Sequence, residues 1–291
     1  MSAVKPNRWA YLVSETQFAT ELVVTGLRRL CTVPDANEWF SSYDQIYPLH
    51  VGLHSYTSGL ERLCKLTIAC HGFVTSGTFP RLKSFSHRIL TLLDRVDSLN
   101  IAGLSSIQLS PMKRPISQLD PDLTKFLQKF ANGTGRYEHL DSLSGDGPTV
   151  STFDTWSSLS NRCSVSKRLM DLVSMREAVN EAMKAIWVHA DFEASGFSTR
   201  GEIDDHFSEK SIALAMEMYN KASWVASSLD AVTYYTGKGL PILNEAMVAI
   251  QQPQVDFFQF SIARIADAEV TSEELKAHHL HYKDYYDYGS Q

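Results

Sequence analysis

The sequence predicts an all-α protein: a helical bundle with an antiparallel helix hairpin at its centre and additional helices towards the C-terminus. Three observations support this fold class. Apolar residues between positions 47 and 99 recur at steps of three and four, which is the spacing of one face of an α-helix. Comparable stretches return in the second half of the chain. No segment shows the alternation of apolar and polar residues that is typical of strands.

The predicted hairpin lies in residues 47–99. The apolar face of its first helix stops between residues 72 and 80, where Gly and Pro become frequent, and then resumes in a second helix. Two amphipathic helices joined by such a turn are expected to pack antiparallel. Arg81 and His87 are expected at the start of the second helix. The face positions are Leu49, Leu53, Tyr56, Leu60, Leu63 and His71 in the first helix, and Phe85, Ile89, Leu92, Val96 and Leu99 in the second.

Further helices are expected on both sides of the hairpin. Residues 7–30 carry a looser apolar stripe, and the aromatic residues Trp39, Phe40 and Tyr43 are expected to close one end of the hairpin. Asp120 is placed to cap the free amides of a short helix that has a proline in its first turn. The other predicted helices cover residues 165–194, 209–235, 242–251 and 257–266.

A change of composition divides the chain at residues 100–120. This segment is rich in Ser, Gly and Pro and has no helical period, which is typical of a linker or a long loop. Residues 1–99 are therefore predicted to form the helical core. Residues 121–291 are predicted to form further helices, which either pack on the first part or make a second helical region.

Composition and charge exclude several classes of protein. The 291 residues are 44% hydrophobic and 21% charged, which is enough apolar material for a sizeable core. A net charge of -6 argues against a non-specific nucleic-acid coat, so any RNA binding is expected at a local site. The four cysteines show neither zinc nor disulfide spacing, and no glycine-rich cofactor motif is present, so no metal or cofactor is expected. Without a cleavable leader or a long apolar run, we expect a cytoplasmic protein with no membrane span.

Arg81 and His87, separated by the segment LKSFS, suit the cleavage of RNA without a metal. A neutral histidine can accept the proton of a ribose 2′-hydroxyl, while an arginine stabilises the charge that develops on the phosphate. The alternative is structural: an arginine on the surface and a histidine lining the helix hairpin.

The residues around this pair resemble the HEPN superfamily of helical domains. The resemblance covers residues 47–99 and lies in GLERLCK (residues 59–65) and HRILTLL (residues 87–93), with Arg81 and His87 at the spacing of the nuclease members. It implies a homodimer in which two Arg/His pairs form one composite site that cleaves or binds RNA. Many such proteins are ribonucleases of prokaryotic toxin–antitoxin or antiviral defence systems, so an antitoxin or another defence-system protein is an expected partner. Leu82 replaces the polar residue usual in active members, which favours an alternative: a non-catalytic adaptor or dimerisation protein that binds a protein partner.

Two residues of the first hairpin helix are further candidates. Glu61 and Lys65 are four residues apart and can form an ion pair along the helix. Alternatively, Glu61 or Arg62 faces His87 across the hairpin and orients it. Both residues are therefore predicted to belong to the substrate-binding site.

A glycine-punctuated connection carries another pair of candidates, Arg136 and Tyr137. Polar and aromatic groups on such connections are often binding groups, since an arginine can hold a phosphate and a tyrosine can stack on a base. The alternative is an Arg136–Asp141 ion pair with a buried Tyr137. A third hypothesis, a metal-dependent enzyme, rests on His50 and His54, which are four residues apart on one helix face but lack a visible third ligand.

Overall fold

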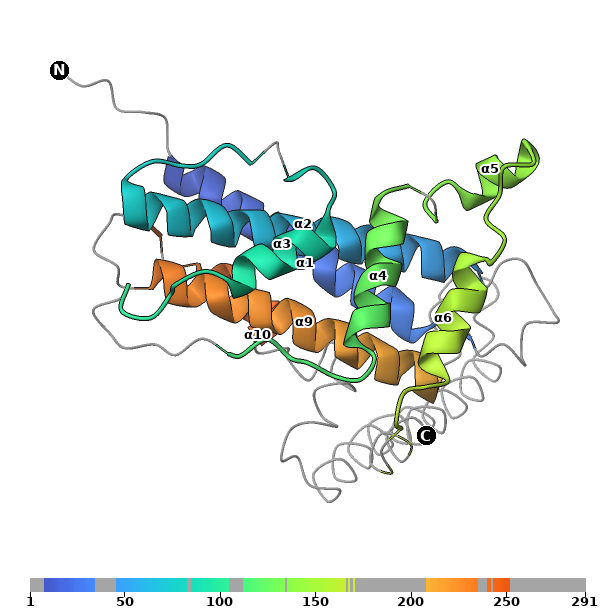
Figure 1. Ribbon diagram of the computed structural model, residues 1–291. Helices are drawn as coiled ribbons and strands as arrows, with labels where there is room; N and C mark the ends of the chain where they lie inside the picture. The colour runs from blue at the N-terminus through green and yellow to red at the C-terminus, as the bar shows by residue number, and fades with distance from the viewer. Residues whose placement is uncertain are drawn as a thin grey trace, which may run out of the picture.

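The computed structural model describes residues 8–34, 46–82, 85–104, 112–133, 135–165, 167, 170, 208–234, 240–241 and 243–251 (Figure 1). Every regular element in these residues is helical, which confirms the all-α prediction. No helix among them combines the length and the apolarity that a membrane span requires. In chain order the elements are α1 (Arg8–Cys31), α2 (Ile46–Ser76), α3 (Ile89–Asp97), α4 (Asp120–Ala131), α5 (Glu138–Leu143), α6 (Thr152–Ser160), α9 (Glu209–Thr233), the 3-10 helix η5 (Asn244–Met247) and α10 (Val248–Gln251).

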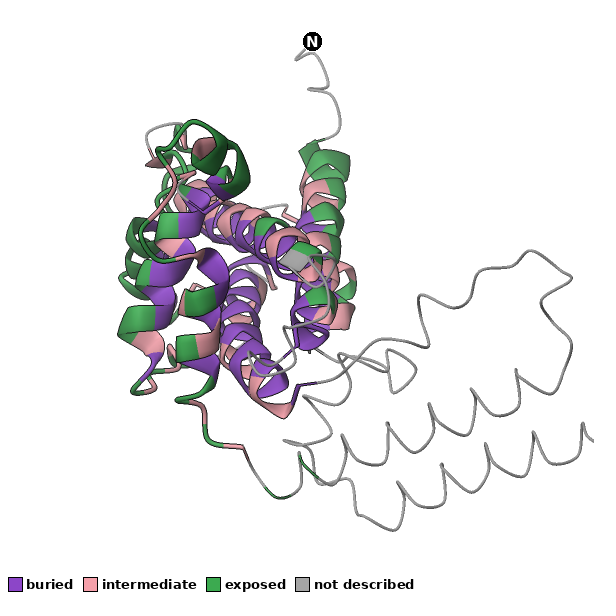
Figure 2. Cartoon of the chain, turned by 90° about the vertical axis from the view of Figure 1, so that its right-hand side faces the viewer, coloured by how far each residue is buried: buried purple, intermediate pink, exposed green. Residues whose placement is uncertain are grey.

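Three long helices, α1, α2 and α9, form the body of the bundle. They lie side by side, with α9 running in the same direction as α2 (Figure 1). The shorter helices α3, α4 and α6 cross this layer on one side, while α5 projects from the end of the molecule (Figure 1). Buried residues lie on the sides of the helices that face one another, and exposed residues lie on the outer sides (Figure 2). The described helices after residue 120 thus pack on those before residue 100, whereas the division of the chain into domains stays a prediction.

The predicted apolar face of α2 is confirmed. Its five aliphatic and aromatic positions are completely buried in the common core, and the Tyr56 hydroxyl donates a hydrogen bond of 2.6 Å to the carbonyl oxygen of Met218 in α9. His71, at the end of the predicted face, is only partly buried, and its Nε2 lies 3.2 Å from the carbonyl oxygen of Asn100. The five buried positions are Leu49, Leu53, Tyr56, Leu60 and Leu63.

Helix α1 packs antiparallel against α2 through glycines. A Cβ atom added at Gly26 would lie 2.5 Å from the Tyr56 backbone nitrogen, and one added at Gly59 would lie 2.8 Å from the Ala19 carbonyl oxygen. Because the opposing atoms belong to the backbone, they cannot move aside as a flexible side chain could. These glycines therefore set the close approach of the two helices.

We expect Gly59→Ala to destabilise the protein by about 2–3 kcal/mol, the usual cost of overfilling a packed interface. The direction of the change in stability is informative, because replacing glycine by alanine at an open position of a helix would instead stabilise the protein by up to ~1 kcal/mol. Urea unfolding followed by circular dichroism measures the difference. Gln17→Ala, at an exposed position of α1, is the control and should change little. An unfolding free energy of Gly59→Ala equal to the wild type would contradict the close packing.

The predicted hairpin differs from the observed arrangement in its second helix. Helix α3 begins at Ile89, so Arg81 precedes it in irregular backbone and His87 lies in a turn just before it. The prediction that both residues start the helix is wrong, because a turn between Phe85 and Arg88 intervenes. The apolar pattern itself holds, since Ile89, Leu92 and Val96 are buried. The long antiparallel neighbour of α2 is α1.

The described parts of the predicted linker, residues 100–104 and 112–119, lie against the bundle. Arg114 donates a hydrogen bond of 2.8 Å to Asp94 in α3 and lies with its guanidinium 5.6 Å from the ring centre of Trp224 in α9. The backbone nitrogen of Met112 also donates to the Ser227 hydroxyl of α9, at 3.1 Å. This segment therefore contacts both α3 and α9.

The predicted helix at Asp120 is present, but its cap differs. Leu119 is the N-cap residue, with no side-chain hydrogen bond, and the Asp120 carboxylate instead accepts a hydrogen bond from Lys221, a lysine that is 98% buried. The capping role predicted for Asp120 is therefore wrong, because a buried ammonium group on α9 takes the carboxylate. The helix predicted at residues 209–235 is confirmed as α9. The aromatic cluster of Trp39, Phe40 and Tyr43 lies outside the described residues, and so does the helix predicted at residues 257–266. Of the helix predicted at residues 165–194, only residues 165, 167 and 170 are described.

Candidate functional site

A cleft of about 340 Å³ lies between α2, the segment before α3 and the turn before α5. It contains four of the residues singled out in the sequence, brought together from three separate parts of the chain. Both charged and apolar side chains line it. The lining residues are Glu15, Ser58, Glu61, Arg62, Lys65, Leu66, Ala69, Leu82, His87 and Arg136.

His87 and Glu61 form a hydrogen-bonded pair in this cleft. Nδ1 of His87 lies 2.9 Å from Oε2 of Glu61, and Nζ of Lys65 donates to the other carboxylate oxygen at 2.6 Å. Because a carboxylate only accepts, it selects the imidazole tautomer with the proton on Nδ1. The Glu61 side chain is 12% exposed, whereas that of His87 is 58% exposed. The pair thus leaves Nε2 of His87 as the nitrogen that is free to exchange protons with a ligand.

The backbone around His87 is held by α4. The side-chain amide of Gln128 donates to the carbonyl oxygen of His87 at 3.3 Å and accepts from the backbone nitrogen of Leu90 at 3.0 Å. Ser86, the residue before the histidine, has a φ of 47°, in the left-handed region that costs about 1–2 kcal/mol for a residue with a Cβ atom. Strained backbone of this kind is concentrated at functional sites.

The opposite side of the cleft is formed by α1. Arg62 donates to the Glu15 carboxylate, and its guanidinium lies 4.7 Å from the centre of the Phe18 ring. A guanidinium placed in this way is attracted by the ring face and keeps several N–H groups for other acceptors. Arg62 therefore links the cleft to the surface of α1.

Arg136 reaches the cleft from the turn before α5, where it is partly buried. Its Nε atom is buried without a hydrogen-bond partner in the part of the chain that the structure describes. Desolvation, and then the positive charge of Arg136, lowers the pKa of the neighbouring His54 below 6.5. His54 is therefore neutral at pH 7.

The lowered pKa of His54 predicts that the stability of the protein depends on pH. Because the folded-state pKa lies below the unfolded value, the stability that His54 contributes is present above pH 6.5 and is lost as the pH falls through the lowered pKa. In an NMR titration we expect His54 to protonate below pH 6.5 and Arg136→Gln to move its pKa back towards that value. An unchanged His54 pKa in Arg136→Gln would show that the guanidinium lies elsewhere.

The structure separates the residues predicted for the site. Glu61, Arg62, His87 and Arg136 line the cleft, whereas Arg81 is exposed and lies outside its lining. Glu61, rather than Arg62, is the residue that faces His87. Tyr137 is 53% exposed and is also outside the cleft lining.

The structure bears on two alternatives raised by the sequence: an Arg136–Asp141 ion pair with a buried Tyr137, and a metal site at His50 and His54. Within the described residues no ion pair joins Arg136 to Asp141, and Tyr137 is exposed rather than buried. His50 lies with its Nε2 atom 3.6 Å from a carboxylate oxygen of Glu138. No group of three side chains able to hold a metal ion is found among the described residues, so His50 and His54 have no third ligand there.

Sequence reasoning missed part of the cleft. Ser58 lines the cleft three residues before Glu61, which is itself four residues before Lys65, and this is the spacing of one face of α2. This polar stripe is visible in the sequence and could have marked the floor of the cleft. Glu15 could not be found in this way, because it reaches the cleft only through the packing of α1 on α2.

The chain matches no protein-family model, no curated protein and no solved structure.

Proposed function

We propose that this protein cleaves RNA by metal-independent acid–base chemistry in the cleft that holds His87. The observation that carries the proposal is the hydrogen bond between Nδ1 of His87 and the carboxylate of Glu61. A largely buried carboxylate behind an exposed imidazole is a recurring arrangement in acid–base catalysis, since it orients the ring and fixes its tautomer.

The reaction that suits this pair is an internal transesterification. Nε2 of His87 accepts the proton of a ribose 2′-hydroxyl, and the 2′-oxygen forms a bond to the adjacent phosphorus. The bond from phosphorus to the 5′-oxygen then breaks, and the 5′-oxygen takes a proton from water. The products are a 2′,3′-cyclic phosphate and a 5′-hydroxyl, and His87 returns its proton to solvent.

The cleft also supplies positive charge for the phosphate. Arg136 lines it together with His87, and a guanidinium can stabilise the extra negative charge of the pentacoordinate phosphate. The phosphate-binding role predicted for Arg81 stays a prediction, because this residue lies outside the cleft lining.

The same proposal includes the family suggested by the sequence. We infer a HEPN-like protein that works as a homodimer in a prokaryotic defence or toxin–antitoxin system. This inference is supported by the resemblance over residues 47–99 and by the position of His87 beside a carboxylate of the preceding long helix. A genomic neighbourhood with a small adjacent antitoxin gene would favour it.

Glu61→Gln tests whether the carboxylate orients His87. We expect kcat to fall about tenfold to a hundredfold with little change in KM, because a glutamine amide can donate as well as accept and no longer selects the Nδ1–H tautomer. Nitrogen NMR should also show His87 losing its preference for the Nδ1–H tautomer. Glu21→Gln, on the exposed surface of α1, is the matched control. A Glu61→Gln variant with wild-type kcat and tautomer would end the positioning role.

A second candidate function is that of a non-catalytic adaptor. It is favoured by the exposed apolar side chains on α5 and next to it, because such patches often mark protein–protein contacts. Tyr137, Leu140 and Leu143 are 53%, 64% and 86% exposed. An adaptor would show no ribonuclease activity and would lose its protein partner when Leu140 and Leu143 are replaced by serine.

A further inference from the structure

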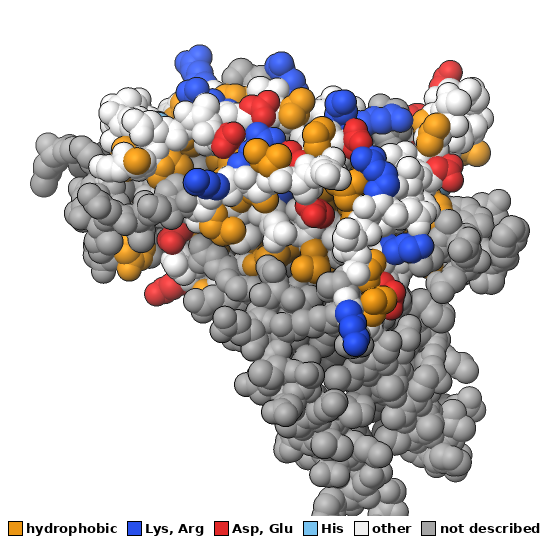
Figure 3. Space-filling view, turned by 60° about the horizontal axis from the view of Figure 1, so that its bottom comes forward, with side chains coloured by type: hydrophobic (Ala, Val, Ile, Leu, Met, Phe, Trp, Pro, Cys, Tyr) orange, Lys and Arg blue, Asp and Glu red, His pale blue; other side chains and the backbone are white. Residues whose placement is uncertain are grey.

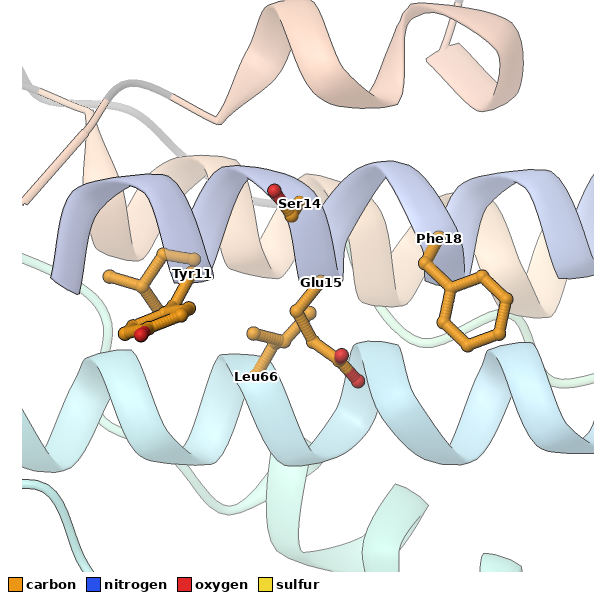
Figure 4. A pocket seen from close by; sticks show the side chains of 6 residues that line it. Tyr11, Ser14, Glu15, Phe18 and Leu66 are labelled. Atoms are coloured by element: carbon orange, nitrogen blue, oxygen red, sulfur yellow. The ribbon is translucent and has the colours of Figure 1, made fainter. Parts of the chain in front are cut away.

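A second hollow adjoins the cleft and extends it along α1. It measures about 550 Å³ and is lined by Tyr11, Leu12, Ser14, Glu15, Phe18 and Leu66 (Figure 4). Glu15 and Leu66 also line the cleft of His87. The two hollows thus share two lining residues, and we call them together the α1–α2 groove, with Tyr11 in the lining of one and His87 in the lining of the other.

Two exposed aromatic rings border this groove. Tyr11 is 68% and Phe18 is 49% exposed, although both have large apolar surfaces. They are seven residues apart, so they lie on the same face of α1, about 10 Å from each other along the helix axis. Figure 4 shows both rings on the side of α1 that faces α2, with Glu15 and Leu66 between them. Each ring is accessible from solvent in this arrangement.

The charges in the groove favour an anionic ligand. Arg62, Lys65 and Arg136 stand against the carboxylates of Glu15 and Glu61. Each carboxylate already pairs with one of the first two cations, so Arg136 is the cation in excess. On the face in Figure 3, by contrast, Lys and Arg side chains are dispersed among acidic and apolar ones. The groove is thus a local site within an acidic protein, as the net charge of -6 requires.

From these features we propose that the α1–α2 groove binds single-stranded RNA, with bases stacked on Tyr11 and Phe18 and the backbone directed towards His87. The proposal rests on the RNA cleavage proposed above. Unpaired bases stack on exposed aromatic rings with little regard for sequence, and arginine contributes by stacking beside them. A duplex keeps its bases stacked on each other, so it could not use these two rings. The guanidinium of Arg62, which lies over Phe18, is placed to contact the backbone between them.

A binding measurement separates this proposal from the cleavage reaction. The probe is a fluorescent 2′-O-methyl oligouridylate of about 12 nucleotides, close to the site sizes of single-strand binders. It lacks the 2′-hydroxyl, so it can be bound but not cut. We expect the wild type to bind it more weakly as salt increases. Tyr11→Ala/Phe18→Ala should weaken binding by about tenfold or more, the effect of losing base stacking.

Trp9→Ala is the matched control. Trp9 is 56% exposed on the same helix, but it is nine residues from Phe18 and therefore on the opposite face of α1. Its removal should change the Kd by less than about twofold, within the range of a neutral surface substitution. Equal losses in Trp9→Ala and Tyr11→Ala/Phe18→Ala, or no binding by the wild type, would overturn the proposal.

Two further outcomes are distinguished by the same proteins. If Tyr11→Ala/Phe18→Ala binds the probe normally but changes from two copies to one in sedimentation equilibrium, the groove is an interface with a second copy and the RNA proposal is wrong. If the wild type binds the probe through Tyr11 and Phe18 but does not cut unmodified oligouridylate, the groove proposal stands and the cleavage reaction fails.

Discussion

Replacing His87 by alanine is expected to lower kcat/KM for RNA cleavage by about 100-fold to 10,000-fold, the usual contribution of a general acid–base residue. The imidazole is more than half exposed, so its removal leaves no cavity in the core. The melting temperature should therefore remain that of the wild type. Cleavage of a labelled single-stranded RNA, followed on a gel, and differential scanning fluorimetry measure the two quantities on the same preparation.

The control is His139→Ala, which removes an exposed histidine outside the lining of the cleft. It should cleave RNA at the wild-type rate, so that a loss in His87→Ala cannot be ascribed to any surface histidine. Wild-type cleavage by His87→Ala would exclude the catalytic role, and a large fall in its melting temperature would point to a structural one.

The second large effect concerns stability. Asp120→Ala is expected to lower the free energy of unfolding by about 3–5 kcal/mol, because it leaves the ammonium of Lys221 buried without its partner carboxylate. The Lys221 side chain is only 2% exposed, and Arg114, 3.8 Å from the same carboxylate, adds a second positive charge. Urea unfolding of the purified variant measures the loss.

The matched control is Asp122→Ala, in the same turn of α4. Asp122 pairs with Arg162 at 2.8 Å, but both side chains are 47% exposed, so this pair should contribute less than about 1 kcal/mol. Asp120→Ala/Lys221→Met should recover much of the loss, because it removes the buried charge as well. Equal effects of Asp120→Ala and Asp122→Ala would mean that the Lys221 ammonium reaches water.

Local periodicity predicted much of the fold. The steps of three and four in residues 47–71 identify the buried face of α2, because one face of an isolated helix depends only on its own residues. A helix at residues 209–235 can also be predicted from the sequence, and it is present as α9. The start of α3 was placed too early, since the backbone turn that contains Ser86 depends on Gln128 of α4 and not on neighbouring residues.

Long-range contacts account for what sequence reasoning could not find. The sequence predicts that Asp120 caps a helix. Its contact with the buried Lys221 forms only in the folded protein, because the two residues are far apart in the sequence. The sequence offers Glu61 either an ion pair with Lys65 or a contact with His87, and the structure shows both, the second because the path of the chain after α2 brings His87 to the carboxylate. The α1–α2 groove depends on the close approach of two helices, and the seven-residue spacing of Tyr11 and Phe18 does not show which neighbour they face.

The central claim is that His87 and Glu61 cut RNA through its own 2′-hydroxyl, and the ends of the products test it most directly. We expect the wild type, in the presence of EDTA, to leave 2′,3′-cyclic phosphate and 5′-hydroxyl ends on a single-stranded RNA, and a single 2′-deoxy substitution to block cleavage at that position. Mass spectrometry of the products distinguishes these ends from others. Products with 5′-phosphate ends, or cleavage that stops in EDTA, would contradict the account.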